Sequence, residues 1–236
     1  MTLLTLALVA QLAQPIQSGP SRIRQLTFAD PEVGTVLYGI SVPSDYDPQR
    51  PRPLVLALHP GGSGPYYGTS FMRSMWLSGL HELGAIIVTP DCPTRSWTDP
   101  VSERAVMALV QKVLGEYAVD RRRILVTGFS LGGRGTWFFS SRHADLFTAA
   151  IPMAASVGNE PTDRLGTIPS YIIHSRDDQV SPFAPAEQNA QTLEKLGRPI
   201  RFEALRGITH FEMGGYVDSL ARAGRWIAER WDKRAE

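Results

Sequence analysis

The chain has 236 residues, which is long enough for one well-buried domain. Its 24 Lys and Arg nearly cancel its 23 Asp and Glu, so no broad positive field exists to bind nucleic acid or an anionic membrane surface. Cys92 is the only cysteine, which excludes an internal disulfide and a multi-cysteine metal site. Because its neighbours offer only Arg95 as a positive charge, we expect a buried, unreactive thiol.

The N-terminus carries an apolar run, "MTLLTLALVAQLAQPIQ", with small residues at Ala10 and Ala13. This pattern is typical of a signal peptide and predicts export to the periplasm or the medium, with residues 1–20 removed from a domain of residues 21–236. The alternative is an N-terminal extension on a cytoplasmic protein. The run is too short to cross a bilayer, so we expect no stable membrane insertion.

Apolar runs alternate with segments of helical period along the chain. The runs predict strands at residues 36–43, 53–60, 85–90, 123–128, 147–155, 170–175 and 200–205. Apolar residues three and four apart predict helices at residues 71–83, 102–119, 132–143, 185–196 and 215–231, with Ser102 as an N-cap. Buried strands separated by helices favour a doubly wound, mostly parallel α/β sheet covered on both faces. No insertion is long enough for a large lid domain.

The stretch "RILVTGFSLGGRG" contains a G-x-S-x-G motif centred on Ser130. Alone the motif is weak, since it arises often by chance and also fits a plain glycine-rich turn. Here it lies between a predicted strand and a predicted helix, which is the arrangement of a nucleophile elbow. Glycines are needed beside such a serine because its backbone is strained and its neighbours pack without a Cβ atom. We therefore predict that Ser130 is a nucleophile.

A nucleophilic serine needs a base, and His210 is the best-placed of five histidines. In a fold of this type the chain order is serine, acid, histidine, whereas His59 and His81 precede Ser130. His143 falls at the end of a helix, and His174 lies inside an apolar strand. Only His210 follows the last strand in a loop, at the edge where active groups collect.

The acid and the oxyanion donors are expected in two other loops. Asp177 and Asp178 both follow the predicted strand at residues 170–175, and spacing alone does not separate them. The backbone N–H of Leu131, after the nucleophile, is one expected oxyanion donor. The second comes from "HPGG": Pro60 has no N–H, so Gly61 or Gly62 must supply it.

From residue 37 onward the chain resembles the α/β-hydrolase superfamily, and within it the short carboxylesterase, phospholipase and "predicted peptidase" group. The matching segments are "SDYDPQRPRPLVLALHPGGSG", "TPDCPTRSW", "DRRRILVTGFSLGGRGTWFFSSRHADLFTAAIPMAA", "IIHSRDDQVSP" and "THFEM". The family pattern H-G-x-x-D-x-x-V-P, laid on "HSRDDQVSP", implies that Asp178 is the acid. Two positions depart from the family: Pro60 replaces a glycine after His59, and Thr209 replaces a glycine before His210.

The resemblance implies a serine carboxylesterase that acts through a Ser130, Asp178 and His210 triad and an acyl-enzyme. It implies a small-molecule ester as substrate and neither a metal nor an organic cofactor; the oligomeric state stays open. Aromatic residues after strands, namely Tyr66, Tyr67, Phe71 and Trp97, are candidates for substrate binding, with loop packing as the alternative. Without a lid, an open pocket favours short-chain or soluble esters.

Two other functions stay open from the sequence. A serine peptidase of the prolyl oligopeptidase type has the same triad order, although such peptidases generally carry a large additional domain. The second is a non-catalytic binding protein on a hydrolase fold. Feruloyl and polyester esterases are subclasses that the sequence does not distinguish.

Overall fold

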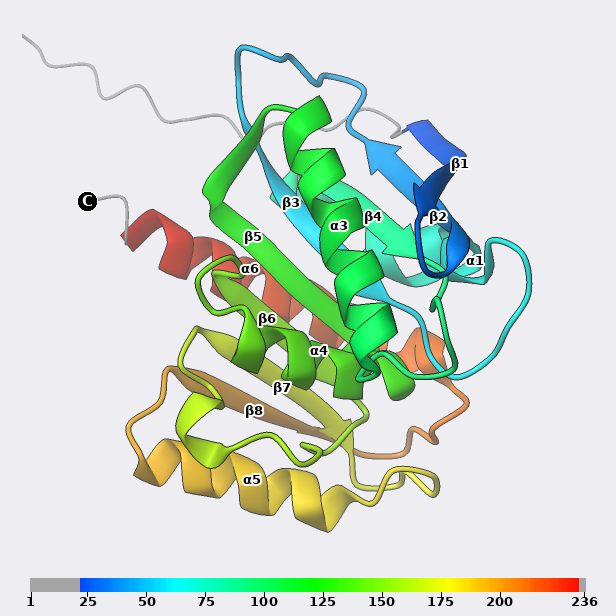
Figure 1. Ribbon diagram of the computed structural model, residues 1–236. Helices are drawn as coiled ribbons and strands as arrows, with labels where there is room; N and C mark the ends of the chain where they lie inside the picture. The colour runs from blue at the N-terminus through cyan, green and yellow to red at the C-terminus, as the bar shows by residue number, and fades with distance from the viewer. Residues whose placement is uncertain (1–21, 234–236) are drawn as a thin grey trace, which may run out of the picture.

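The computed structural model describes residues 22–233, which form one eight-stranded sheet with helices on both faces (Figure 1). The predicted signal peptide therefore lies outside the described residues. The strands are β1 (Arg22–Asp30), β2 (Gly34–Val42), β3 (Arg52–Leu58), β4 (Ile86–Pro90), β5 (Val119–Phe129), β6 (Ala149–Met153), β7 (Ser170–Ser175) and β8 (Ile200–Leu205). Their order across the sheet is β1-β2-β4-β3-β5-β6-β7-β8.

The sheet is mostly parallel, as the sequence predicts. Strands β3 to β8 pair in parallel, while β1 and β2 form an antiparallel hairpin whose second strand runs antiparallel to β4. Strand β1 was not predicted, because this edge strand has no continuous apolar run: most of its residues are at least partly exposed. The first residues of β2, next to the hairpin turn, nevertheless line the cavity of the candidate active site.

Helices cover the two faces of the sheet in separate groups. The helical segments are α1 (Tyr67–Phe71), a π-helical turn (Met72–Leu77), α2 (Ser78–Leu80), a 3-10 turn (His81–Leu83), α3 (Pro100–Glu116), α4 (Leu131–Arg142), a 3-10 turn (Thr162–Arg164), α5 (Phe183–Lys195), a 3-10 turn (Met213–Tyr216) and α6 (Val217–Lys233). In Figure 1, α3, α4 and α5 lie in front of the sheet and α6 lies behind it. All five predicted helices are confirmed, the first as a chain of four short segments.

The N-cap of α3 differs from the prediction. Helix α3 begins after Asp99, whose carboxylate accepts hydrogen bonds from the backbone N–H groups of Val101 and Ser102, and Pro100 occupies the first helical position. Ser102 instead turns its hydroxyl inward to Thr94, whose hydroxyl lies 2.9 Å away. The prediction of Ser102 as the cap is therefore wrong, because aspartate followed by proline starts the helix three residues earlier.

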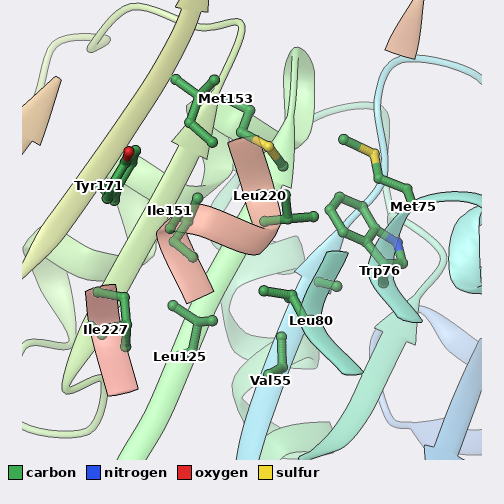
Figure 2. Close-up of a cluster of buried hydrophobic side chains, with 14 of the residues drawn as sticks. Val55, Met75, Trp76, Leu80, Leu125, Ile151, Met153, Tyr171, Leu220 and Ile227 are labelled. Atoms are coloured by element: carbon green, nitrogen blue, oxygen red, sulfur yellow. The ribbon is translucent and has the colours of Figure 1, made fainter. Parts of the chain in front are cut away.

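The two large clusters of the hydrophobic core lie on opposite faces of the sheet. In β3, Val55 and Ala57 face the layer that contains α6, whereas Leu54, Leu56 and Leu58 face α3 and α4. Figure 2 shows the first layer: side chains of the π-helical turn, α2 and α6, among them Trp76, Leu80 and Leu220, pack over Val55 and Leu125 of the sheet. Burial of both faces explains why the parallel strands appear in the sequence as continuous apolar runs.

Close packing of α2 on α6 gives a test of this layer. A Cβ atom added to Gly79 would lie 2.6 Å from Leu220, whereas one added to Gly115 of α3 meets open space. We expect Gly79→Ala to lower the free energy of unfolding by about 1–3 kcal/mol through overpacking. Gly115→Ala is the matched control and should raise it by roughly 0.5 kcal/mol through helix propensity. Urea unfolding measures both, and equal effects of the two substitutions would contradict this packing.

Candidate active site

Ser130 occupies a strained turn between β5 and α4. Its backbone angles are φ 55° and ψ −115°, a region that residues other than glycine rarely adopt. Two backbone hydrogen bonds hold the turn: Ser130 N–H donates to Met153 O over 3.0 Å, and Arg134 N–H donates to Ser130 O over 2.9 Å. The turn lifts the serine hydroxyl out of the sheet at the carboxyl ends of β5 and β6.

Three glycines allow α4 to begin directly against the sheet. A Cβ atom on Gly132 would lie 2.0 Å from Leu58 O, and one on Gly133 would lie 2.2 Å from Met153 O. A Cβ atom on Gly128 would lie 2.3 Å from Gly132 O. No side chain fits at these positions, so the glycines are required by the close approach of three backbone segments. The first turn of α4 is therefore held between the ends of β3 and β6.

His210 and Asp178 complete a hydrogen-bonded chain that begins at Ser130. His210 Nε2 lies 2.8 Å from Ser130 Oγ, and His210 Nδ1 lies 2.7 Å from Asp178 Oδ2. The Asp178 side chain is fully buried and that of His210 is 7% exposed. A carboxylate that holds Nδ1–H leaves Nε2 free to accept the serine proton. Residues that lie far apart in the sequence thus meet at one edge of the sheet.

The turn after β7 separates the two aspartates that spacing could not distinguish. Asp178 Oδ1 accepts hydrogen bonds from the N–H groups of Val180 and Ser181, over 2.9 and 2.7 Å, so its Oδ2 is directed at His210. Asp177 is exposed and accepts from Gly207 N–H instead. Of the two aspartates, Asp178 is therefore the one in contact with the imidazole.

His174 lies beneath this turn, fully buried at the end of β7. Its Nε2 lies 2.9 Å from Ser181 O and 3.6 Å from Asp178 Oδ2. Because Ser181 O only accepts, Nε2 carries the proton and donates to it. Burial lowers the pKa of His174, so the ring is neutral and supports the turn without adding a charge beside Asp178.

The predicted oxyanion residues line one cavity of about 670 Å³ next to Ser130. Leu131, Gly61 and Gly62 all form part of its wall. The "HPGG" loop, which follows β3, and the first turn of α4 thus line the same cavity. Both predicted sources of backbone N–H donors are therefore brought together at the functional edge of the sheet.

Of the aromatic residues predicted to bind substrate, only Tyr67 reaches this cavity. Tyr67 lines it, and Tyr66 is not part of the lining. Trp97 is fully buried in the core, where its Nε1–H donates to His59 O over 3.0 Å, so the expectation that it lines a substrate site is corrected. Its indole buries a large apolar area and satisfies its one donor inside the protein. Phe71, the fourth aromatic considered, is packed partly buried against the core.

Most of the cavity wall was not predicted from the sequence. The additional lining residues are Thr35, Val36, Leu37, His59, Ser63, Gly64, Pro65, Asp91, Cys92, Pro93, Thr94 and Arg95. Thr35, Val36 and Leu37 lie at the start of β2; the apolar run predicted a strand at residues 36–43 but not that its first residues reach this cavity. Cys92 is partly exposed here, and burial raises the pKa of its thiol to about 11, which keeps it protonated near neutral pH.

Two further observations concern membrane-spanning helices and metal-binding groups among the described residues. No helix in residues 22–233 is both long and apolar enough to cross a membrane. Within the same residues, no group of three or more His, Cys, Asp or Glu side chains is placed to hold a metal ion. The reactive groups of the described site are a hydroxyl, an imidazole, a carboxylate and backbone N–H donors. These are the groups that an acyl-transfer reaction requires.

The sheet order, the elbow and the serine–histidine–aspartate chain define an α/β-hydrolase fold. No protein-family model matches the sequence. The chain is 28% identical over 157 residues to feruloyl esterase C of Emericella nidulans, which covers 62% of this chain and 56% of that protein. It is 27% identical over 162 residues to a probable acetylxylan esterase A of Aspergillus niger, covering 63% of this chain and 51% of that protein. The match thus spans little more than half the length of these curated relatives.

Solved structures agree with this fold. The crystal structure of a thermostable esterase matches with a TM-score of 0.74 and 28% identity, over 88% of this chain and 62% of that one. A ferulic acid esterase matches with a TM-score of 0.73 and 16% identity, over 89% of this chain and 98% of that one, which bears on the fold alone. The mostly parallel sheet predicted from the sequence is confirmed, and residues 22–233 contain no separate lid domain.

Backbone strain at Ser130 is open to direct measurement. Glycine adopts a positive φ without a steric penalty, whereas alanine keeps the Cβ atom that causes the strain. We expect Ser130→Gly to unfold with a free energy about 0.5–2 kcal/mol higher than that of Ser130→Ala, because strain relief exceeds the entropy cost of glycine. Urea unfolding of the two variants measures the difference. A Ser130→Ala protein as stable as Ser130→Gly would show that the turn is not strained.

Proposed function

We propose that this protein is a serine hydrolase that cleaves carboxylic esters, with Ser130 as nucleophile, His210 as general base and Asp178 as the residue that orients the imidazole. The observation that carries the proposal is the continuous hydrogen-bonded chain of these three side chains at a strained turn. Its relatives and structural neighbours include feruloyl, acetylxylan and thermostable esterases, which supports ester bonds as the target.

The first half of the reaction acylates the enzyme. Ser130 Oγ attacks the ester carbonyl carbon while His210 Nε2 accepts the hydroxyl proton, and the electron pair of the C=O bond moves onto oxygen. Asp178 Oδ2 holds Nδ1–H and stabilises the imidazolium that forms. When the tetrahedral intermediate collapses, the C–O bond of the ester breaks and His210 returns the proton to the departing alcohol.

The second half releases the acid. Water attacks the acyl-enzyme carbonyl as His210 accepts its proton, and collapse of the second intermediate returns that proton to Ser130 Oγ. In both halves the negative charge on the carbonyl oxygen is stabilised by the N–H of Leu131 and by an N–H of the Gly61–Gly62 segment. The N-terminal end of α4, directly behind Ser130, adds a favourable dipole.

The substrate class is also a proposal. Within residues 22–233 no segment forms a separate lid domain, and the cavity beside Ser130 combines glycine backbone, polar groups and a few apolar side chains. This supports a small-molecule ester of the kind that the short carboxylesterase group cleaves.

Substitution of the triad gives the first test of this proposal. Ser130→Ala is expected to lower kcat for a p-nitrophenyl ester by about 10⁴-fold or more while the protein still folds, because no nucleophile remains. Asp178→Asn should lower kcat by about 10⁴-fold, since the amide favours the wrong imidazole tautomer. Asp177→Asn is the matched control and should stay within about twofold, because its side chain is exposed and turned away from His210.

Steady-state kinetics with folding checked by circular dichroism measures these values. A Ser130→Ala enzyme with near-wild-type ester turnover would end the assignment of the nucleophile. Equal losses in Asp177→Asn and Asp178→Asn would end the assignment of the acid.

A series of p-nitrophenyl esters tests the substrate class. In an apolar acyl groove each buried methylene stabilises binding by about 0.8 kcal/mol, which corresponds to roughly a fourfold rise in kcat/KM. Because glycines and polar residues alternate with apolar ones in the cavity wall, we expect kcat/KM to peak between acetate and butyrate. A value that keeps rising from butyrate to laurate would contradict a short-chain esterase.

A further inference from the structure

His59, at the carboxyl end of β3, is a buried histidine that the proposed reaction does not use directly. It is 2% exposed, and each ring nitrogen has a backbone partner. Cys92 N–H donates to Nε2 over 2.9 Å, and Nδ1 lies 2.6 Å from Pro60 O. Because Nε2 accepts, the single proton of the neutral ring must lie on Nδ1, which donates to Pro60 O.

The surroundings of His59 hold the ring in this state. Tyr67 and Trp97 pack edge-on against it, each with ring centroids 4.9 Å away, and Trp97 Nε1–H donates to the His59 carbonyl. A second proton on Nε2 would face the Cys92 N–H. Burial lowers the pKa of His59, so the ring keeps one proton near neutral pH.

The hydrogen bond to Pro60 O fixes the direction of the next peptide group. No described peptide bond is cis, and the C=O and N–H groups of a trans peptide point in opposite directions. Since the buried imidazole holds Pro60 O, the N–H of Gly61 points away from the ring, outward from the core. Gly61 is exposed and lines the cavity together with Leu131.

A second contact orients the following peptide separately. Tyr67 Oη donates to Gly61 O over 3.2 Å, so Gly62 N–H points away from the tyrosine. The two candidate donors are thus held by two different side chains: His59 controls Gly61 N–H, and Tyr67 controls Gly62 N–H. Substitution of one side chain or the other therefore tells the two donors apart.

We propose that His59 is a positioning residue for the oxyanion hole: its Nδ1–H holds Pro60 O so that Gly61 N–H, together with Leu131 N–H, faces the carbonyl oxygen of the substrate. This inference rests on the proposed function and extends it to a residue that touches no reacting atom. Pro60 makes the role necessary, because it has no N–H and leaves Gly61 as the first donor in the loop. The contact between His59 Nδ1 and Pro60 O is buried and 2.6 Å long, whereas the contact between Tyr67 Oη and Gly61 O is exposed and 3.2 Å long.

The test compares two amides at position 59. The side-chain amide of asparagine lies near the position of Nδ1 and can still donate to Pro60 O, whereas that of glutamine reaches the position of Nε2 and can accept only from Cys92 N–H. Each variant keeps one of the two hydrogen bonds of His59, so we expect similar losses of stability in urea unfolding. Activity should separate them.

We expect His59→Gln to lower kcat by about 100-fold with KM little changed, because one oxyanion donor is no longer held in place. His59→Asn should restore kcat to within roughly fivefold of wild type, since the hydrogen bond to Pro60 O is kept. If both variants lose kcat equally, in proportion to their loss of free energy of unfolding, the proposal is overturned. A larger kcat loss in Tyr67→Phe than in His59→Gln would assign the donor to Gly62 and also overturn it.

A measurement on the wild-type protein covers the case in which the variants fold poorly. On addition of phenylboronic acid, which forms a tetrahedral adduct with a reactive serine, the amide proton resonance of Gly61 should shift downfield and that of Gly62 should not. The reverse pattern would overturn the inference. Ser130→Ala is the control, because the proposed function fails if this variant hydrolyses esters normally. If Ser130→Ala is inactive but His59→Gln and His59→Asn have the same kcat, only the role of His59 is ruled out.

Discussion

The close approach of the first turn of α4 to the ends of β3 and β6 is the constraint on which the rest of the site depends. At Gly132 and Gly133 the helix backbone lies so near to Leu58 O and Met153 O that no Cβ atom fits. The chain leaves β5 and enters the helix within one residue, and Ser130 takes up a positive φ as a result. Such a conformation costs about 1–3 kcal/mol, which the packed sheet on either side offsets.

The contact between the first turn of α4 and the sheet also connects the loops that form the site. Gly132 also lies against the His59 carbonyl, so the start of α4 and the loop after β3 share a boundary, and the cavity opens between them. On the opposite side of the serine, Phe129 lies beside His210 and packs edge-on against Tyr216, whose hydroxyl accepts a hydrogen bond from Ser175 N–H. The histidine loop and the acid turn are thereby tied to β5 and β7. Rigid strands, rather than the loops themselves, fix the distances between the reacting groups.

Much of this arrangement could be predicted from the sequence, because the physical causes are local. Continuous apolar strands that alternate with helical periods indicate a parallel sheet, and a serine between glycines at a strand-to-helix junction indicates an elbow. The choice between Asp177 and Asp178 could not be made from spacing, since it depends on which carboxylate receives the N–H groups of Val180 and Ser181. Edge strand β1 and the burial of Trp97 were missed for a similar reason: tertiary contacts, not local pattern, determine them.

The most direct test of the central claim is the reaction of the folded protein with a fluorophosphonate, followed by mass spectrometry of the intact chain and of its peptides. Only a serine that is activated by a neighbouring base and held beside oxyanion donors reacts readily with this reagent. We expect one adduct per chain, located on Ser130 and absent from the Ser130→Ala protein. An unmodified chain, or an adduct on any other residue, would contradict it.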